Sequence, residues 1–421
     1  MVKTAIRSGF LLLLTAYSAA AQTPTGYVSL FGDYFPNRRD AAELRGRIFV
    51  EEKLEPSTRI AINLAGFAEG LLARRATIGE PRSVTDAIVR IQEASVALSG
   101  RRADLLAGFA RVTWGKLDEI QPTDVINPLD VSRFFFEGRS EARLPVLLVR
   151  GRFHVNDDAA IEGVYVPDFR SGRFDRLDEP SSPFNLPLAI AGTPFVVDQR
   201  DDRKPAFTAR NAQGGARLSA TSGTVDWSVS AYRGFESFGL YEIDPASVPP
   251  LTIARVHPRF TMIGGDVEAV RGQWGLRGEV AVFVDDNFQS SDARVVRGSS
   301  IDAGAGVDRR AAGATWSGTV LFHAESYERP LSAVNSDTER KDLTFVGSFD
   351  RTFSRERYRL RGFAVYNANE GSAFLRTIAM ASLRDNVALE GSIGWFAGDG
   401  RDLVGRFGDS DFVYARLKYY F

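Results

Sequence analysis

The sequence DFVYARLKYYF, residues 411–421, ends the chain and decides the fold. Counted back from Phe421, every second residue is apolar or aromatic, and Lys418 and Arg416 lie between them. A period of two predicts a strand with one apolar face and one polar, partly cationic face. An ordinary edge strand is the alternative for this stretch alone, but a terminal aromatic residue on such a strand is typical of outer-membrane β-barrels. We interpret the apolar set as the signal read by the outer-membrane assembly machinery: Val413, Ala415, Leu417, Tyr419 and Phe421.

The amino-terminal segment has the pattern of a secretory signal peptide. Lys3 and Arg7 are basic, residues 10–14 are apolar, and the alanines at 19–21 precede Gln22. The apolar run is too short for a membrane helix, which needs about 20 residues, and no later segment approaches that length. We expect residues 1–21 to be a signal peptide and the mature chain to start near Gln22. Such an exported chain is periplasmic, secreted, or a β-barrel of the outer membrane.

The composition excludes several classes of protein. The chain has no cysteine, which excludes disulfides and zinc–thiolate sites, and its 52 basic and 53 acidic residues give no argument for nucleic acid. A mean hydropathy below zero excludes a helical membrane protein but suits a barrel, in which half of each strand faces water. No low-complexity linker or shift in composition divides residues 22–421. We therefore expect a single domain.

Alternation of period two predicts eighteen strands, with sixteen as the nearest alternative. They are Tyr27–Tyr34, Glu43–Leu54, Thr58–Glu69, Asp86–Leu98, Ala103–Thr113, Val146–Asn156, Ala159–Pro167, Ala206–Ser219, Val225–Phe235, Pro258–Val270, Trp274–Asp285, Ile301–Val307, Ala314–Glu325, Asp342–Phe353, Arg357–Asn367, Ala373–Leu383, Val387–Ala397 and Asp411–Phe421. The connections alternate between tight turns and mostly long loops, as periplasmic turns and extracellular loops do. This rhythm favours an all-β fold, a single antiparallel transmembrane β-barrel, over a soluble β-sandwich.

The pleat assigns each residue to the lipid or the lumen. In the strand 146–156, Val149 and Phe153 would face lipid and Arg150 and Arg152 the lumen. Four tryptophans fall on the outward parity, where interfacial girdles would use them: Trp227, Trp274, Trp316 and Trp395. The inward arginines have two interpretations, pairing with inward carboxylates to fill the lumen or a cationic ladder that guides an anionic solute. The mixed signs favour the first.

The long connection after residue 113 reads WGKLDEIQPTDVINPLDVS over residues 114–132, and LPV follows at residues 144–146. Its Trp-Gly, Asn-Pro-x-Asp and Leu-Pro-Val elements resemble a family of Gram-negative outer-membrane proteins called domain of unknown function 1302, over about residues 105–155. Two departures are Lys116, where that family more often has Glu, and Phe134–Phe136 in place of a basic stretch. The resemblance implies an outer-membrane location and passage of hydrophobic or aromatic compounds, and it carries no catalytic residues.

We expect the connection 114–145 to be folded toward the lumen. Pro122 and Pro128 restrict the backbone, and residues 123–133 could include a helical turn. Three consecutive phenylalanines need cover from water, which the barrel mouth would supply. The segment would then act as a plug or as a constriction that selects solutes. The predicted constriction residues are Trp114, Phe134, Phe135, Phe136, Arg150 and Arg152.

These residues predict a porin-like channel of the cell outer membrane for small hydrophobic or amphipathic anions. Aromatic faces bind apolar bodies and arginines hold carboxylates, although sugar channels also use aromatic residues. One alternative is a structural or adhesive barrel without transport. The other is a barrel-embedded hydrolase that would use His323 with Ser317, Ser326 and Glu325.

Catalysis and metal binding have little support in the sequence. The three histidines, His154, His257 and His323, are far apart, and none has metal-ligand spacing with another. We expect no enzymatic activity, no cofactor and no metal. The expected partners are the lipid bilayer with its lipopolysaccharide, the assembly machinery and a small-molecule solute, but no nucleic acid.

Overall fold

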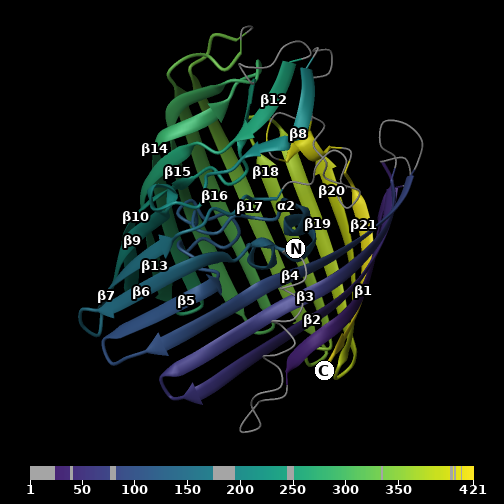
Figure 1. Cartoon of the computed structure of the whole chain (residues 1–421). Helices are drawn as coiled ribbons and strands as arrows, with labels where there is room; N and C mark the ends of the chain where they lie inside the picture. The colour runs from purple at the N-terminus through teal and green to yellow at the C-terminus, as the bar shows by residue number, and fades with distance from the viewer. Residues whose placement is uncertain are drawn as a thin grey trace, which may run out of the picture.

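The fold is a closed antiparallel β-barrel of eighteen strands (Figure 1). The computed structural model describes residues 24–37, 41–75, 82–173, 195–243, 251–332, 335–398, 402, 404–408 and 410–421, so the predicted signal peptide lies outside the described residues. Each barrel strand pairs with the next barrel strand along the chain. Pairing of the first strand with the last, from Tyr27 with Tyr420 to Tyr34 with Val413, closes the sheet.

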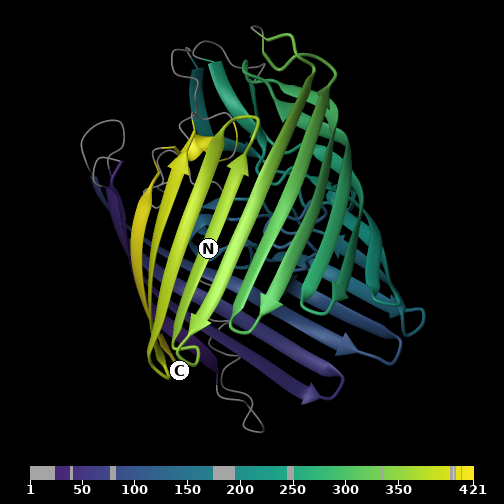
Figure 2. The same ribbon diagram turned by 180° about the vertical axis from the view of Figure 1, so that it is seen from behind.

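Every predicted strand corresponds to one strand of the barrel, so the eighteen-stranded fold is confirmed. The barrel strands are β1 Thr25–Phe35, β2 Ala41–Ser57, β3 Ile60–Arg75, β4 Arg82–Ser99, β5 Ala103–Ala110, β6 Val146–His154, β7 Ala159–Val166, β9 Gln213–Ser222, β10 Val225–Phe235, β13 Arg259–Arg271, β14 Trp274–Gln289, β15 Val295–Ala311, β16 Ala314–Tyr327, β17 Glu339–Phe353, β18 Tyr358–Asn367, β19 Ser372–Arg384, β20 Val387–Ala397 and β21 Phe412–Tyr420. Tight turns lie at the end of the barrel that holds the carboxyl terminus (Figure 2). Gly223, Gly272 and Gly313 give three of these turns the positive φ that they need, between 62° and 72°.

The two faces of the barrel follow the predicted parity. On β21 and at the residue that follows it, Val413, Leu417 and Phe421 are 44–50% exposed, whereas Tyr414 and Arg416 between them are buried. The four tryptophans on the outward parity are 36–50% exposed. A charge on the lipid face costs up to about 2–4 kcal/mol at the bilayer midplane, which is why the outer surface is apolar.

The long connections contain a second, smaller sheet that the sequence did not predict. It consists of β8 Phe195–Arg203, β11 Leu240–Ile243 and β12 Leu251–Val256, and β8 runs parallel to β12. This sheet lies at the long-loop end of the barrel (Figure 1). Asp202 joins β8 to β12 and to the residue after it. Its carboxylate accepts hydrogen bonds from Arg255 of β12 at 2.5 Å and from His257 at 3.0 Å. Among the described residues, no helix has the length and apolar character to cross a membrane.

Candidate functional site

The candidate site is built around the connection between β5 and β6, residues 111–145, which we call the inner segment. It contains two short helices, α2 Val131–Glu137 and α3 Arg139–Ala142. Its side chains and backbone contact inward-facing residues of strands on opposite walls, among them β14 and β21. Figure 1 shows α2 within the outline of the barrel. The inner segment therefore crosses the lumen, and its anchors decide how it sits there.

The carboxylate of Glu279 on β14 is the first anchor. One of its oxygens accepts hydrogen bonds from the backbone N–H of Thr123 at 2.7 Å and from the hydroxyl of Thr123 at 2.8 Å. The other accepts from the backbone N–H groups of Lys116 at 3.0 Å and Leu117 at 3.2 Å. Gly115 has a φ of 96°, and a Cβ there would lie 2.6 Å from the Glu279 carboxylate. The Trp-Gly element thus has a physical reason, since only glycine fits against this carboxylate.

The side chain of Asn127 is the second anchor, and it joins the two ends of the inner segment. Its Oδ1 accepts a hydrogen bond from the backbone N–H of Val112 at 2.7 Å, while its Nδ2 donates to the carbonyls of Ala110 and Leu144 at 3.2 and 2.8 Å. The backbone N–H of Leu144 donates to the carbonyl of Pro128 at 2.8 Å. The Asn-Pro and Leu-Pro-Val elements therefore meet at the base of the segment, where the chain leaves β5 and enters β6.

The third anchor is Asp124, which ties α3 to the first half of the segment. Its carboxylate accepts two hydrogen bonds from Arg143, at 3.0 and 2.5 Å, and two from Arg139, at 3.3 and 3.2 Å. Hydrogen bonds between two charged groups are among the stronger ones in proteins. A helical turn was expected within residues 123–133. The helix α2 begins only at Val131, near the end of that range, and continues to Glu137. As a result, all three phenylalanines belong to this helix.

Phe135 and Phe136 are buried and hold α2 against the barrel wall. Phe135 is 4% exposed and packs edge-on against Phe374 and Phe396, each with ring centroids 5.3 Å away. Phe136 is 3% exposed, and its ring centroid lies 5.6 Å from that of Phe31 on β1. Phe134 is only partly buried against this cluster. The inner wall formed by β1 and β19–β21 supplies the cover that these rings need.

Trp114 and Arg150 come together on a different wall. The indole N–H of Trp114 donates to Glu162 on β7 at 2.8 Å, and its ring meets Tyr232 on β10 edge-on at 6.2 Å. The guanidinium of Arg150 lies 3.9 Å from the same Glu162 carboxylate. The guanidinium of Arg152 is partly buried on the same strand, and its Nε has no hydrogen-bond partner among the described residues. The six predicted constriction residues thus divide between two walls, and Trp114, 1% exposed, is a packing residue.

The hydrolase alternative finds no support in the geometry. Both ring nitrogens of His323 contact carboxylates, Nδ1 with Asp302 at 2.5 Å and Nε2 with Glu325 at 2.8 Å. Ser317 is hydrogen-bonded to another serine across the strand, and Ser326 lies on the opposite face of β16 from His323. No group of three or more acidic, histidine or cysteine side chains suited to a metal ion occurs within the described ranges.

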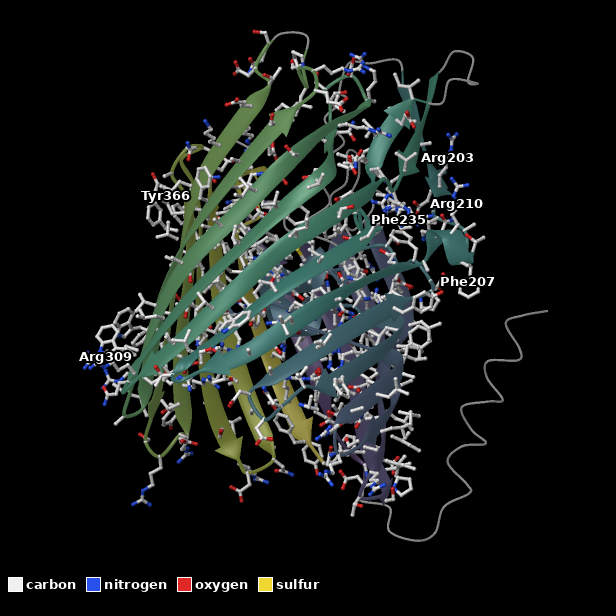
Figure 3. All side chains as sticks on the ribbon, turned by 90° about the vertical axis from the view of Figure 1, so that its left-hand side faces the viewer. Arg203, Phe207, Arg210, Phe235, Arg309 and Tyr366 are labelled. Atoms are coloured by element: carbon white, nitrogen blue, oxygen red, sulfur yellow. The ribbon has the colours of Figure 1, made fainter. Side chains whose placement is uncertain are left out.

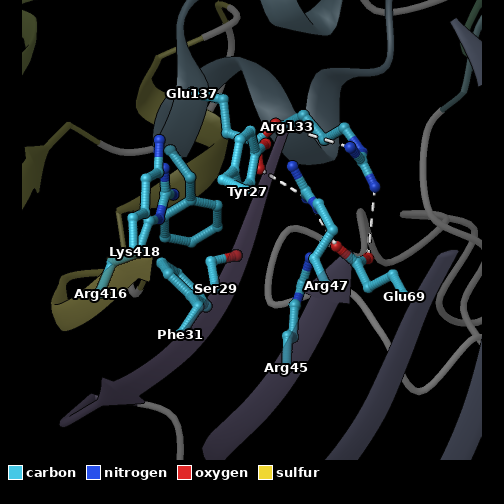
Figure 4. A pocket seen from close by; sticks show the side chains of 11 residues that line it. Tyr27, Ser29, Phe31, Arg45, Arg47, Glu69, Arg133, Glu137, Arg416 and Lys418 are labelled. Carbon is cyan, nitrogen blue, oxygen red and sulfur yellow. Dashed lines mark hydrogen bonds and ion pairs between the residues drawn. The ribbon is translucent and has the colours of Figure 1, made fainter. Parts of the chain in front are cut away.

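A basic pocket lies against α2 on the inner wall, and sequence reasoning missed it (Figure 4). Its lining is Tyr27, Ser29, Phe31, Arg45, Arg47, Glu69, Arg133, Phe136, Glu137, Arg416 and Lys418. These residues come from β1, β2, β3, α2 and β21, which only the closure of the barrel brings together. The available signal was the inward parity of Arg45 and Arg47 on β2 and of Arg416 and Lys418 on β21.

The cations of the basic pocket are not equally neutralised. Arg47 lies 2.6 Å from Glu69 and 2.7 Å from Glu137, and Arg133 lies 3.2 Å from Glu69. Burial alone would raise the pKa of Glu137, but the charges of Arg47 and Arg133 outweigh it and hold this pKa well below its usual range. Both carboxylates of the pocket therefore form their closest ion pairs with Arg47 and Arg133.

Arg416 and Lys418 lack such a close carboxylate in the described part of the chain. The carboxylate that pairs with Arg416 is Glu390, 3.9 Å away, and Lys418 forms no ion pair among these residues. Instead, the guanidinium of Arg416 and the ammonium of Lys418 each lie 4.9 Å from an aromatic centroid, those of Phe31 and Tyr27. Aromatic faces attract cations but leave their hydrogen-bond donors free for an anion.

The closed sheet and its apolar outer face define a transmembrane β-barrel. Residues 91–346 match the family described as "Protein of unknown function (DUF1302)", which is more than half of the chain, so the chain belongs to this family. The match is wider than the predicted resemblance over residues 105–155. No curated protein matches the chain.

Solved structures agree in fold. The chain is similar to OccK7 (OpdD) of Pseudomonas aeruginosa, with 9% identity, coverage of 96% of this chain and 99% of that one, and a TM-score of 0.50. It is also similar to OccAB3 of Acinetobacter baumannii, with 10% identity, coverage of 94% and 99%, and a TM-score of 0.48. At 9% identity the likeness to OccK7 (OpdD) concerns the fold alone.

Proposed function

We propose that the chain is an outer-membrane channel for small amphipathic anions, and that the basic pocket holds their carboxylate or similar anionic group. One observation carries this proposal: Arg416 and Lys418 face the pocket over aromatic rings, the ion pair of Arg416 with Glu390 is long at 3.9 Å, and Lys418 forms no ion pair with a described residue. A guanidinium and an ammonium side by side attract an anion and can donate several hydrogen bonds to it. The barrel fold, which the chain shares with OccK7 (OpdD), is consistent with this role.

The pocket also suits the apolar part of such a solute. Tyr27 and Phe31 present aromatic surface beside the two cations, and Phe136 of α2 closes one side. Glu69 and Glu137 pair with Arg47 and would repel an anion that moved toward it. The solute would therefore bind at the β21 side. A channel requires binding that is favourable enough for entry but weak enough for release.

The inner segment is proposed as the selectivity element that narrows the path to this pocket. In this role Phe135 and Phe136 hold α2 in place, while the partly buried Phe134 and the wall residues Arg150 and Arg152 remain proposed solute contacts. The predicted outer-membrane location belongs to the same proposal.

Reconstituted barrels test the proposal. We expect the wild-type chain to form conducting channels in planar bilayers and to pass octanoate into liposomes faster than a disaccharide. Replacement of Arg416 and Lys418 by Gln removes charged hydrogen-bond donors worth about 1.5–3 kcal/mol each, so octanoate flux should fall by about tenfold or more. The matched control replaces Lys53 and Arg310, whose side chains are 58% and 75% exposed, by Gln. Absence of any conductance and swelling would refute the channel, and unchanged octanoate flux in the first variant would refute the pocket.

A further inference from the structure

Three arginines lie close together on the outer surface of the barrel, where neighbouring residues are apolar. Arg233 on β10 and Arg259 on β13 have the outward parity of Val229 and Ile263, which are 51% and 56% exposed. Arg210 lies in the short 3-10 helix η2 Ala209–Asn211, which precedes β9. The backbone carbonyl of Arg210 accepts a hydrogen bond from Arg259 at 2.5 Å. We call these three residues the outer arginine cluster.

The cluster has no countercharge in the described part of the chain. Arg233 donates to the hydroxyl of Thr261 at 2.9 Å, and the guanidinium of Arg259 stacks over the ring of Phe235 at 4.1 Å. None of the three arginines forms an ion pair with a carboxylate of a described residue. The positive charges of Arg210 and Arg233 repel that of Arg259. Like charges held near each other on a low-dielectric surface repel, and a bound anion would relieve this repulsion.

The position of the cluster indicates which anion is available. Arg233 and Arg259 lie at the ends of β10 and β13 that lead into the long loops, so the expected topology places them at the outer leaflet. Figure 3 shows Arg203, Phe207, Arg210 and Phe235 together on one side of the barrel, in its long-loop half, whereas Arg309 lies toward the other end. The ring of Phe207 is 69% exposed beside the cluster. Exposed aromatic rings are typical of the interfacial region of a bilayer.

We infer that the outer arginine cluster binds the phosphate groups of lipopolysaccharide, the anionic glycolipid of the outer leaflet. Guanidinium groups form paired hydrogen bonds with phosphate oxygens, and three of them match a headgroup with more than one phosphate. The acyl chains of the same molecule would lie along the apolar face below, against Phe207 and Val229. The three positive charges lie near the bilayer–water interface, where a charged residue on the lipid face lowers the stability of the barrel by only about 0–1 kcal/mol. The inference concerns the outer face and does not depend on the proposed channel.

The test measures binding of purified, delipidated barrel to deep-rough lipopolysaccharide that carries its lipid A phosphates. The triple variant Arg210→Gln, Arg233→Gln, Arg259→Gln is compared with a matched triple variant at the short-turn end, in which Arg271, Arg309 and Arg351 are changed to Gln. All three control positions are exposed on the outer face. Heat-modifiable migration confirms that each variant is folded. Enzymatically dephosphorylated lipid A, phosphatidylglycerol and inorganic phosphate are the comparison ligands.

We expect the cluster variant to bind lipopolysaccharide at least about tenfold more weakly than wild type, which corresponds to about 1.4 kcal/mol, and the control variant to bind like wild type. Dephosphorylated lipid A should bind weakly to all three proteins, and added salt should weaken only the phosphate-dependent binding. Equal binding of lipopolysaccharide by wild type and cluster variant overturns the inference. Binding of phosphatidylglycerol or inorganic phosphate as tightly as lipopolysaccharide overturns the assignment to that glycolipid.

Discussion

Replacement of Glu279 by Gln should release the first half of the inner segment from the barrel wall. The four donors that meet this carboxylate are shared equally between its two oxygens. A glutamine offers one oxygen, so whichever way its amide turns, two of the four donors face an NH2 group. A buried donor without an acceptor costs about 1–3 kcal/mol, so the attachment weakens by about 2–6 kcal/mol. The shape of the side chain is unchanged, and the barrel strands keep all their pairings.

Amide hydrogen exchange of residues 115–124 measures this attachment directly. A loss of 2–6 kcal/mol corresponds to about 30-fold to 10^4-fold faster exchange, since each 1.4 kcal/mol is about a factor of ten. Exchange of α2 should change less, because its aromatic rings hold it to another wall. Single-channel conductance should rise as the segment detaches. The control is Glu268→Gln, which affects a partly exposed carboxylate that binds the side chains of Lys116 and Arg277 and should cost no more than about 1 kcal/mol. Unchanged exchange in the Glu279 variant, or equal acceleration in the control, would show that this anchor is unimportant.

Three further changes test other parts of the chain. Asn127→Ala leaves buried backbone groups at the base of the inner segment without partners and should lower the free energy of unfolding by about 1–3 kcal/mol in a denaturant titration; no loss would contradict the anchoring role. Deletion of Phe421 removes its two backbone hydrogen bonds with Gly26, both 3.1 Å, and should reduce heat-modifiable barrel without blocking signal-peptide removal; normal assembly would refute the predicted signal. Burial raises the pKa of Glu236 from 4.5 to about 8, so the folded state keeps a proton that the unfolded state loses, and stability falls as pH rises through this window. Glu236→Gln should abolish that fall in thermal unfolding measured from pH 5 to 8, and an unchanged pH dependence would contradict the assignment.

The barrel could be predicted from sequence because lipid enforces the parity of every membrane-spanning strand. Outside the lipid this constraint ends, and the predictions fail there in two ways. Strand ends differ from those that the alternation indicated: β15 Val295–Ala311 extends beyond the predicted residues 301–307, whereas β9 begins at Gln213 and not at Ala206. The sheet of β8, β11 and β12 was missed because its short strands have no lipid-facing side, and contacts such as Asp202 with Arg255 hold them together instead.

The candidate site was only partly predictable, for a different physical reason. The need to cover three phenylalanines is local, and the sequence showed it. The identity of the covering wall depends on residues more than two hundred positions away, such as Phe374 and Phe396, and nothing near residue 135 indicates them. Trp114 was predicted to contact solute because it is aromatic and lies in a long loop. Glu162 and Tyr232 surround it instead, and their positions follow from the closure of the barrel.

The family motif and the basic pocket are separate parts of this molecule. Gly115 and Asn127 belong to the motif, and both hold the inner segment in position; Glu279, the wall residue opposite Gly115, also lies within the residues 91–346 that match the family. Arg416 and Lys418 lie outside that range, on the strand that closes the barrel against β1. The anchors require a fixed geometry, because a Cβ at residue 115 would collide with the carboxylate. The pocket requires only charge and aromatic surface on the inward faces of β1, β2, β3 and β21, against α2. We therefore expect substitutions of Arg416 and Lys418 to change which solute binds while the inner segment keeps its place.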